Sequence, residues 1–210
     1  MGGHDAYSSS KGCAELVTSA FRRSFFHDGR VAIASARAGN VIGGGDWAED
    51  RLVPDLVRAA AARVAATVRN PDSVRPWQFV LDPLRGYLLL GRGLTEDGDA
   101  CAEAWNFGPN EGDAVPVREV VRRLSAQWSR VVAEMPTIAN GPHEARRLKL
   151  DSTKAHRRLG WEPVLDLNDT LEMTMSWYRD YYVDPASAPL LVQRQLAAFA
   201  ARVEEAGAAR

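Results

Sequence analysis

The sequence predicts an α/β fold. Val31 to Ala36 is a short apolar run with the composition of a buried strand in a parallel sheet, and Ala104 to Phe107 is predicted to form another strand of the sheet. Other stretches carry apolar residues every three or four positions, a spacing typical of helices with one buried face. A chain that combines these two patterns is expected to form a parallel sheet covered by helices.

The first predicted helix follows the turn-prone residues Gly2 to Asp5 and extends to Phe25. Tyr7 and Lys11 are four residues apart, so their side chains lie on one face of this helix. A lysine ammonium beside a phenol favours the phenolate, which can act as a general base. A tyrosine and a lysine at this spacing also occur by chance on solvated helices, so the pair alone leaves both interpretations open. The apolar positions predict one buried face: Cys13, Leu16, Val17, Ala20, Phe21 and Phe25.

Residues 37–45 are predicted to form the loop at the carboxyl end of the first strand, where ligands bind in open α/β sheets. In this loop, Asn40 is either a loop-stabilising amide or a ligand contact. Gly43 to Gly45 follow a strand, as phosphate-binding glycines do, but the acidic residues from Asp46 to Asp50 would repel a pyrophosphate. We therefore do not expect a phosphate-binding turn here, and the sequence has no other turn of that kind.

The rest of the chain is predicted to consist of short elements. Asp82 and Asp151 are placed to cap the helices that follow them, and Gly160 to close the second of these. Arg75 is either a surface charge or a ligand contact, because a guanidinium can bind a diphosphate with two hydrogen bonds. The predicted helices cover 52–66, 83–93, 117–128, 152–159, 169–182 and 189–210, with an extended segment at 75–80 and short strands at 131–133 and 148–150.

Composition excludes several classes of protein. The 26 basic and 27 acidic residues give a formal charge of −1, without the strongly basic character of a nucleic-acid-binding protein. No segment reaches the roughly 20 apolar residues of a membrane span, and residues 1–10 do not resemble a secretory signal. Cys13 and Cys101 fit no metal-ligand spacing, so no metal is predicted and a cytoplasmic location is the simplest interpretation.

Four stretches, in this order, carry a resemblance to a known family. They are residues 2–15 (GGHDAYSSSKGCAE), 37–47 (RAGNVIGGGDW), 75–83 (RPWQFVLDP) and 142–145 (PHEA). Together they resemble the extended short-chain dehydrogenases/reductases that act on nucleotide sugars, within the NAD-dependent epimerase/dehydratase family. More narrowly, they resemble its 4,6-dehydratases that act on CDP-glucose. The resemblance extends from Gly2 to about Tyr182.

The resemblance implies the C-terminal part of a Rossmann-type doubly wound parallel sheet, plus a small α/β substrate-binding lobe. Residues 1–115 would be the remainder of the NAD-binding domain with interleaved substrate-domain segments, 116–182 mainly the substrate-binding lobe, and 183–210 a C-terminal helix or tail. In this family the glycine-rich NAD motif and the residues of the elimination step lie upstream of the tyrosine. We therefore expect Met1 to be an internal methionine of a longer protein, and this chain alone neither to hold NAD nor to complete the reaction.

In the enzymes that the chain resembles, NAD takes a hydride from C4 of the glucose ring, water leaves across C5–C6, and the hydride returns to C6. The product is a CDP-4-keto-6-deoxyhexose. Tyr7 corresponds to the base that removes the C4 hydroxyl proton, and Lys11 to the residue that assists it and holds the nicotinamide ribose. The resemblance further implies contacts to the nucleotide sugar from Asn40, Leu52, Arg75, His143 and Glu144.

The resemblance also implies a homodimer, in which the helix that carries Tyr7 and Lys11 and the helix that begins at Leu52 form a shared bundle. Two alternatives remain. The chain could belong to another nucleotide-sugar epimerase or dehydratase, because the nucleotide is recognised by loops that vary. It could also be a non-catalytic remnant that binds a nucleotide sugar or only pairs with another subunit.

Overall fold

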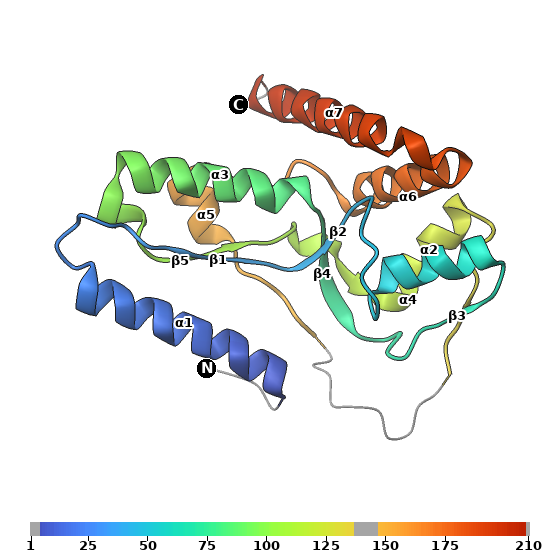
Figure 1. Ribbon diagram of the computed structural model, residues 1–210, viewed down its shortest axis with the longest axis horizontal. Coiled ribbons are helices and arrows are strands. Elements are labelled where there is room, and N and C mark those ends of the chain that lie inside the picture. The colour runs from blue at the N-terminus through green and yellow to red at the C-terminus, as the bar shows by residue number, and fades with distance from the viewer. Residues whose placement is uncertain (1–4, 137–146, 209–210) are drawn as a thin grey trace. The chain divides into compact units, whose positions relative to one another are not determined.

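A computed structural model describes residues 5–136 and 147–208, and the chain divides into two compact units. The first unit comprises residues 1–38, 83–108 and 150–162, and the second comprises 39–82, 109–149 and 163–210. Neither unit is a continuous stretch of chain, as the colours of Figure 1 show. The predicted division at residues 115 and 182, into the remainder of an NAD-binding domain, a substrate-binding lobe and a C-terminal tail, stays a prediction.

The first unit is built on two parallel strands, β1 (Ser35–Ala38) and β5 (Ala104–Phe107), paired from Ser35 opposite Ala104 to Ala38 opposite Phe107. Figure 1 shows this strand pair between α3 on one side and α1 on the other. The other elements of this unit are α1 (Ala6–Phe25), α3 (Leu81–Glu96), the 3₁₀ turn Gly98–Cys101 and α5 (Thr153–Leu159).

Aromatic side chains form the core of the first unit. Trp105 and Phe107 of β5 are fully buried, and so is Trp161, which follows α5. Phe107 meets Trp161 edge-to-face at 5.1 Å between ring centroids, a favourable geometry for aromatic rings. The Trp105 indole N–H donates to the Cys101 carbonyl at 2.9 Å, so this polar group is buried with a partner. The unit's small core therefore rests on a few large rings.

The second unit contains a three-stranded sheet in the order β2-β4-β6, with β2 (Asn40–Ile42) parallel and β6 (Ala114–Pro116) antiparallel to β4 (Val74–Phe79). Two further strands, β3 (Ala66–Thr67) and β7 (Ala133–Glu134), pair in parallel. The helices and 3₁₀ turns are α2 (Leu52–Ala62), the turn Glu111–Asp113, α4 (Val117–Gln127), α6 (Leu167–Val183), the turn Pro185–Ser187 and α7 (Ala188–Ala208).

Helix α6 lies at the centre of the second unit's core. Its residues Leu171, Met175 and Tyr178 are fully buried, and they belong to one cluster with apolar residues of α2 and α4. A smaller cluster joins Phe79 of β4 to Phe199 of α7. No helix in the part of the chain that the structure describes is long and apolar enough to cross a membrane.

Several predicted boundaries are wrong. The first strand begins at Ser35 instead of Val31, because its backbone partner β5 begins opposite Ser35. The predicted loop 37–45 contains the end of β1 and all of β2. The second helix ends at Ala62 instead of Ala66, where Arg63 adopts a left-handed conformation (φ 57°) that stops it. The segment 148–150 contributes no strand, only an isolated bridge from the neighbouring Arg147 to Val74.

Asp82 does not cap the helix that follows it, contrary to the prediction. Helix α3 begins at Leu81, two residues before its predicted start at 83, and Asp82 lies fully buried in its first turn. One carboxylate oxygen of Asp82 accepts the backbone N–H of Val164 at 2.8 Å. Asp82 therefore ties the start of α3 to the segment before α6, a contact that spacing along the chain cannot reveal.

The glycines Gly43 to Gly45 allow the backbone to approach α6. A Cβ atom on Gly44 would lie 2.1 Å from Cγ of Trp177, and Gly45 has φ +82°, which favours glycine. The backbone here packs against an indole ring. This agrees with the expectation that the three glycines do not form a phosphate-binding turn.

We expect Gly44→Ala to destabilise the second unit by about 1–3 kcal/mol, the usual cost of forcing extra volume into a packed site. The added methyl group must displace the buried Trp177 ring. Urea unfolding followed by Trp fluorescence measures this loss. Gly91→Ala is the matched control, because a Cβ on Gly91 in α3 meets nothing within 4 Å. A Gly44→Ala protein as stable as the Gly91→Ala protein would contradict the packing described.

Candidate functional site

The predicted catalytic pair, Tyr7 and Lys11, lies near the start of α1. Asp5 caps this helix: its carboxylate accepts the Ser8 N–H at 2.9 Å and the Ser8 hydroxyl at 2.7 Å. These hydrogen bonds lower the pKa of the Asp5 carboxyl. The cap fixes where the helix begins and thus places Tyr7 in its first turn. Lys11 Nζ lies 5.4 Å from the centroid of the Tyr7 ring, and the Tyr7 side chain is 67% exposed.

Polar contacts connect α1 to the strand pair. One turn after Lys11, the Glu15 carboxylate accepts the Ser35 hydroxyl at 2.8 Å and pairs with Arg37 Nε at 3.0 Å. Two turns further along, Arg22 Nε donates to the Ile33 carbonyl at 2.8 Å. Lys11 and Glu15 are four residues apart, so they share one side of the helix. Tyr7 and Lys11 thus lie close together, as their spacing predicts, and both side chains are exposed to a ligand.

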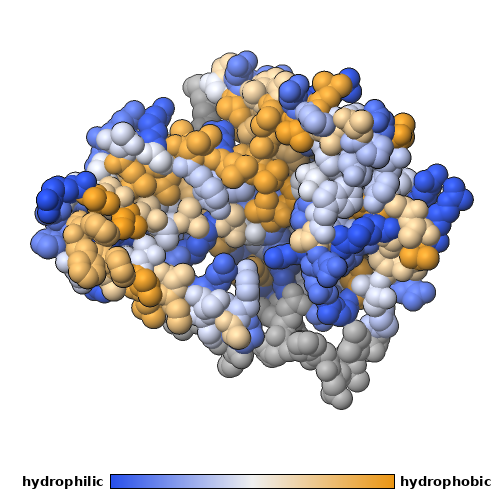
Figure 2. All heavy atoms as spheres, viewed as in Figure 1, coloured by the Kyte–Doolittle hydropathy of each residue, from blue (hydrophilic) through white to orange (hydrophobic). Residues whose placement is uncertain are grey.

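The predicted buried face of α1 is wrong for this chain, because no residue of α1 is buried. The apolar side chains that define this face are largely exposed: Leu16 55%, Val17 55%, Phe21 49% and Phe25 64%. Figure 2 shows apolar residues at the surface at its lower left, over α1. The periodicity correctly predicts a helix with an apolar face, but nothing in the described chain covers that face.

Three predicted substrate contacts lie in the second unit. Asn40 begins β2 and is half-buried, opposite Trp77 of β4. Leu52 is half-buried at the first position of α2. Arg75 in β4 is only 7% exposed, and its Nη1 donates to the Val74 carbonyl at 2.9 Å. The interpretation of Arg75 as a surface charge is therefore wrong.

The predicted site residues thus fall in two groups. Tyr7 and Lys11 belong to the first unit, and Asn40, Leu52 and Arg75 to the second. His143 and Glu144 lie outside the described residues. The roles assigned to all seven residues stay predictions.

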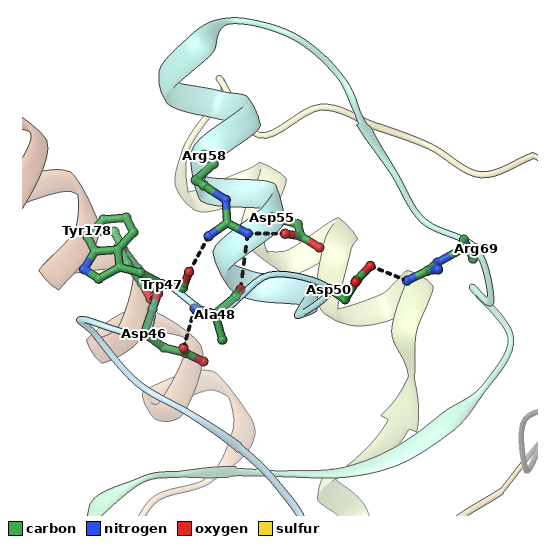
Figure 3. A network of polar contacts seen from close by, with 8 residues as sticks. All are labelled: Asp46, Trp47, Ala48, Asp50, Asp55, Arg58, Arg69 and Tyr178. Atoms are coloured by element: carbon green, nitrogen blue, oxygen red, sulfur yellow. Dashed lines mark hydrogen bonds and ion pairs between the residues drawn. The ribbon is translucent and has the colours of Figure 1, made fainter. Parts of the chain in front are cut away.

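Sequence reasoning missed Arg58 and Tyr178, two residues that bind the loop before α2 (Figure 3). Tyr178 of α6 donates its hydroxyl to the Asp46 carbonyl at 2.7 Å. Arg58 of α2 donates to the carbonyls of Trp47 and Ala48 at 2.8 and 3.2 Å. The only local signal was an arginine within an otherwise apolar helical stretch. The contact of Tyr178 with residue 46 leaves no trace in local spacing.

The described residues fit only part of a dinucleotide. Tyr7 and Lys11 are exposed and could meet the nicotinamide ribose, but Gly43 to Gly45 pack against Trp177 and are followed by the carboxylate of Asp46. They do not fit a pyrophosphate. Within residues 5–136 and 147–208, no group of three His, Cys, Asp or Glu side chains is arranged to hold a metal ion.

Comparison with known proteins confirms the resemblance that the four motifs indicate. The chain is 48% identical over 184 residues to the CDP-glucose 4,6-dehydratase of Salmonella typhimurium, covering 85% of this chain and 51% of that protein. It is 25% identical over 186 residues to a dTDP-glucose 4,6-dehydratase of Haemophilus influenzae, and 26% identical over 181 residues to UDP-glucuronic acid decarboxylase 6 of Arabidopsis thaliana. The chain spans about half the length of these relatives. No family model matches it.

Solved structures confirm the predicted fold class. A dTDP-glucose 4,6-dehydratase from Bacillus anthracis, in complex with NAD, matches with a TM-score of 0.71 at 21% identity, over 91% of this chain and 56% of that one. A UDP-glucose-4-epimerase from Stenotrophomonas maltophila with bound NAD matches with a TM-score of 0.67 at 20% identity, over 81% and 55% of the two chains. The fold is therefore α/β and corresponds to part of the Rossmann-type fold of these enzymes.

Proposed function

We propose that this chain is the part of an NAD-dependent nucleotide-sugar 4,6-dehydratase that carries the tyrosine–lysine pair and most of the substrate contacts, and that its substrate is CDP-glucose. The observation that carries the proposal is the 48% identity to the Salmonella typhimurium enzyme over 85% of this chain. Identity to the dTDP-glucose 4,6-dehydratases is much lower, at 25% or less in those from Haemophilus influenzae and Neisseria gonorrhoeae. This difference favours cytidine as the nucleotide.

In this proposal, Tyr7 removes the proton of the C4 hydroxyl while NAD, when bound, supplies the hydride acceptor. Lys11 Nζ lies 5.4 Å from the centre of the Tyr7 ring, so the lysine stands beside the tyrosine that acts in this step. Lys11 also holds the nicotinamide ribose. Asn40, Leu52 and Arg75, together with His143 and Glu144, bind the nucleotide sugar. Because Gly43 to Gly45 do not fit a pyrophosphate, this proposal takes the rest of the NAD site and the elimination step from residues outside this chain.

Binding of nucleotide sugars to the purified chain tests the substrate class. In calorimetric titrations, CDP-glucose should bind more tightly than dTDP-glucose or UDP-glucose. Tighter binding of either competitor would favour another nucleotide-sugar epimerase or dehydratase, the first alternative. Absence of binding by all three would contradict the proposal. A hybrid polypeptide that joins this chain to the unmatched half of the Salmonella relative should convert CDP-glucose with NAD, whereas the chain alone should not.

A homodimer through α1 is part of the proposal. The exposed side chains of Leu16, Val17, Phe21 and Phe25 give this helix a continuous apolar face, which a second copy can cover. Sedimentation equilibrium should give about twice the 23.0 kDa mass of the chain, and Phe21→Glu should reduce it to the monomer value. A monomer before substitution would contradict this arrangement. The free thiols of Cys13 and Cys101 favour a reducing compartment, which supports a cytoplasmic location.

A further inference from the structure

The loop between β2 and α2 leads directly to Leu52, and it has no regular structure of its own. Residues 43–51 form neither helix nor strand, and residues 45–51 are exposed. Exposed loops of this kind ordinarily sample several conformations, because few buried contacts hold them. Here side chains from two helices bind the backbone of the loop: Tyr178 of α6 and Arg58 of α2, whose contacts Figure 3 shows.

Three consecutive carbonyl groups of this loop accept hydrogen bonds from helix side chains. The Tyr178 hydroxyl binds the Asp46 carbonyl at 2.7 Å. Arg58 Nη1 binds the Trp47 carbonyl at 2.8 Å, and Nη2 binds the Ala48 carbonyl at 3.2 Å. Consecutive carbonyls that are all bound fix the path of the backbone more strongly than any single contact, because each peptide plane is oriented separately.

The guanidinium of Arg58 suits this role because of its shape. Arg58 lies in the second turn of α2 and reaches back to the loop that precedes its own helix, while Nη2 also pairs with Asp55 in the first turn. A planar guanidinium directs several N–H groups at fixed angles, so one side chain can bind two carbonyls and a carboxylate together. A lysine ammonium has the same charge but cannot reproduce this fork.

Aromatic packing between Trp47 and α6 also holds this loop. The Trp47 ring lies between 5.1 and 6.4 Å, centroid to centroid, from the rings of Trp177, Tyr178, Tyr181 and Tyr182 on α6. Burial, aided by the nearby Asp46 carboxylate, raises the pKa of Tyr178 well above its ordinary value. The Tyr178 hydroxyl therefore stays protonated and donates a hydrogen bond to the Asp46 carbonyl throughout the physiological pH range.

We propose that Arg58 and Tyr178 are positioning residues for the nucleotide sugar: they hold residues 46–48 in one conformation and so fix the start of α2, where Leu52 contacts the nucleotide sugar. The inference rests on the proposed function, which gives Leu52 that role. A loop already ordered before the ligand arrives does not lose conformational freedom on binding, so the affinity for the ligand is higher. Neither residue touches the substrate in this proposal.

Amide hydrogen exchange measures the order of the loop directly and needs no ligand. In Arg58→Ala, the amides of residues 46–50 should exchange about tenfold faster, the effect of losing hydrogen bonds to a charged group. Tyr178→Phe should produce a smaller increase. Arg69→Ala is the matched control, because Arg69 also pairs within this loop, with Asp50, but both side chains are largely exposed (59% and 81%). Unchanged exchange in Arg58→Ala would overturn the inference.

Calorimetric binding of CDP-glucose to the same proteins connects the loop to function. Arg58→Ala should weaken binding about five- to tenfold at a temperature where every variant is folded, and Arg69→Ala should not. Arg58→Lys separates positioning from charge: it should weaken binding as Arg58→Ala does, whereas a long-range attraction of the diphosphate would be retained.

Each other result has a defined meaning. Faster exchange with unchanged affinity would show that the loop is held for stability alone, and would overturn the positioning role. Full affinity in Arg58→Lys would also overturn it. If the unmodified chain binds no nucleotide sugar, the proposed function itself fails and the positioning role fails with it.

Discussion

Tyr7→Phe should lower the turnover of CDP-glucose at least about a hundredfold, the usual contribution of a general base. The substitution removes a single oxygen atom from an exposed side chain, so the helix and its Asp5 cap remain. Because the predicted role is proton removal, kcat should fall while the affinity for CDP-glucose changes little. The measurement uses the hybrid polypeptide that joins this chain to the unmatched half of the Salmonella relative.

The control for this experiment is Tyr87→Phe. Tyr87 of α3 also belongs to the first unit and is 36% exposed, and its ring packs against Phe107. The substitution therefore removes a hydroxyl of the same kind from a position without a proposed role, and it should leave kcat within about twofold. Equal kcat values for Tyr7→Phe and Tyr87→Phe would remove the main chemical argument for the dehydratase, whatever the affinity for nucleotide sugars.

Trp161→Ala should destabilise the first unit by about 3–5 kcal/mol, the cost of removing a large aromatic ring from a core. Trp161 is fully buried and meets the rings of Phe107 and His156 at 5.1 and 5.8 Å between centroids. The effect should be large because few other residues form this core. Hydrogen exchange locates the loss: amides of β5 and α5 should lose protection before those of α4 in the second unit.

Trp161→Phe is the comparison that isolates the volume effect. It keeps an aromatic ring against Phe107 and should cost less than half as much as Trp161→Ala. If Trp161→Ala loses protection equally in α4 and in β5, the two units unfold as one. The division of the chain into separate cores would then have no energetic meaning.

The parts of the fold that could be predicted are those determined by neighbouring residues. The strand Ala104–Phe107 has its predicted limits, because an apolar run between turn-forming residues leaves little choice. The first helix and its Tyr7–Lys11 pair were predicted for the same reason, since positions four apart on a helix must face the same way. In these cases local spacing is sufficient.

The parts that could not be predicted depend on partners distant in the sequence. The limits of β1 are set by its pairing with β5. Asp82 accepts a hydrogen bond from the backbone N–H of Val164 instead of capping its own helix. Gly44 looks like a glycine of a flexible turn until Trp177 is placed against it. Single-sequence reasoning had no means of finding these pairs. The role of Tyr178 could not be predicted for the same reason. Its hydroxyl binds a backbone carbonyl, which every residue type has, so the sequence does not mark the partner.

The interleaved course of the chain through its two units has a consequence for folding during synthesis. β1 is made well before its neighbour β5 and the core residue Trp161. The second unit likewise waits for α6, which fills the centre of its core. Contacts between residues so distant in sequence form slowly, and apolar segments made early stay uncovered meanwhile. Neither unit can complete its core on the ribosome before Trp161 and α6 have emerged, and these follow each other closely in the sequence.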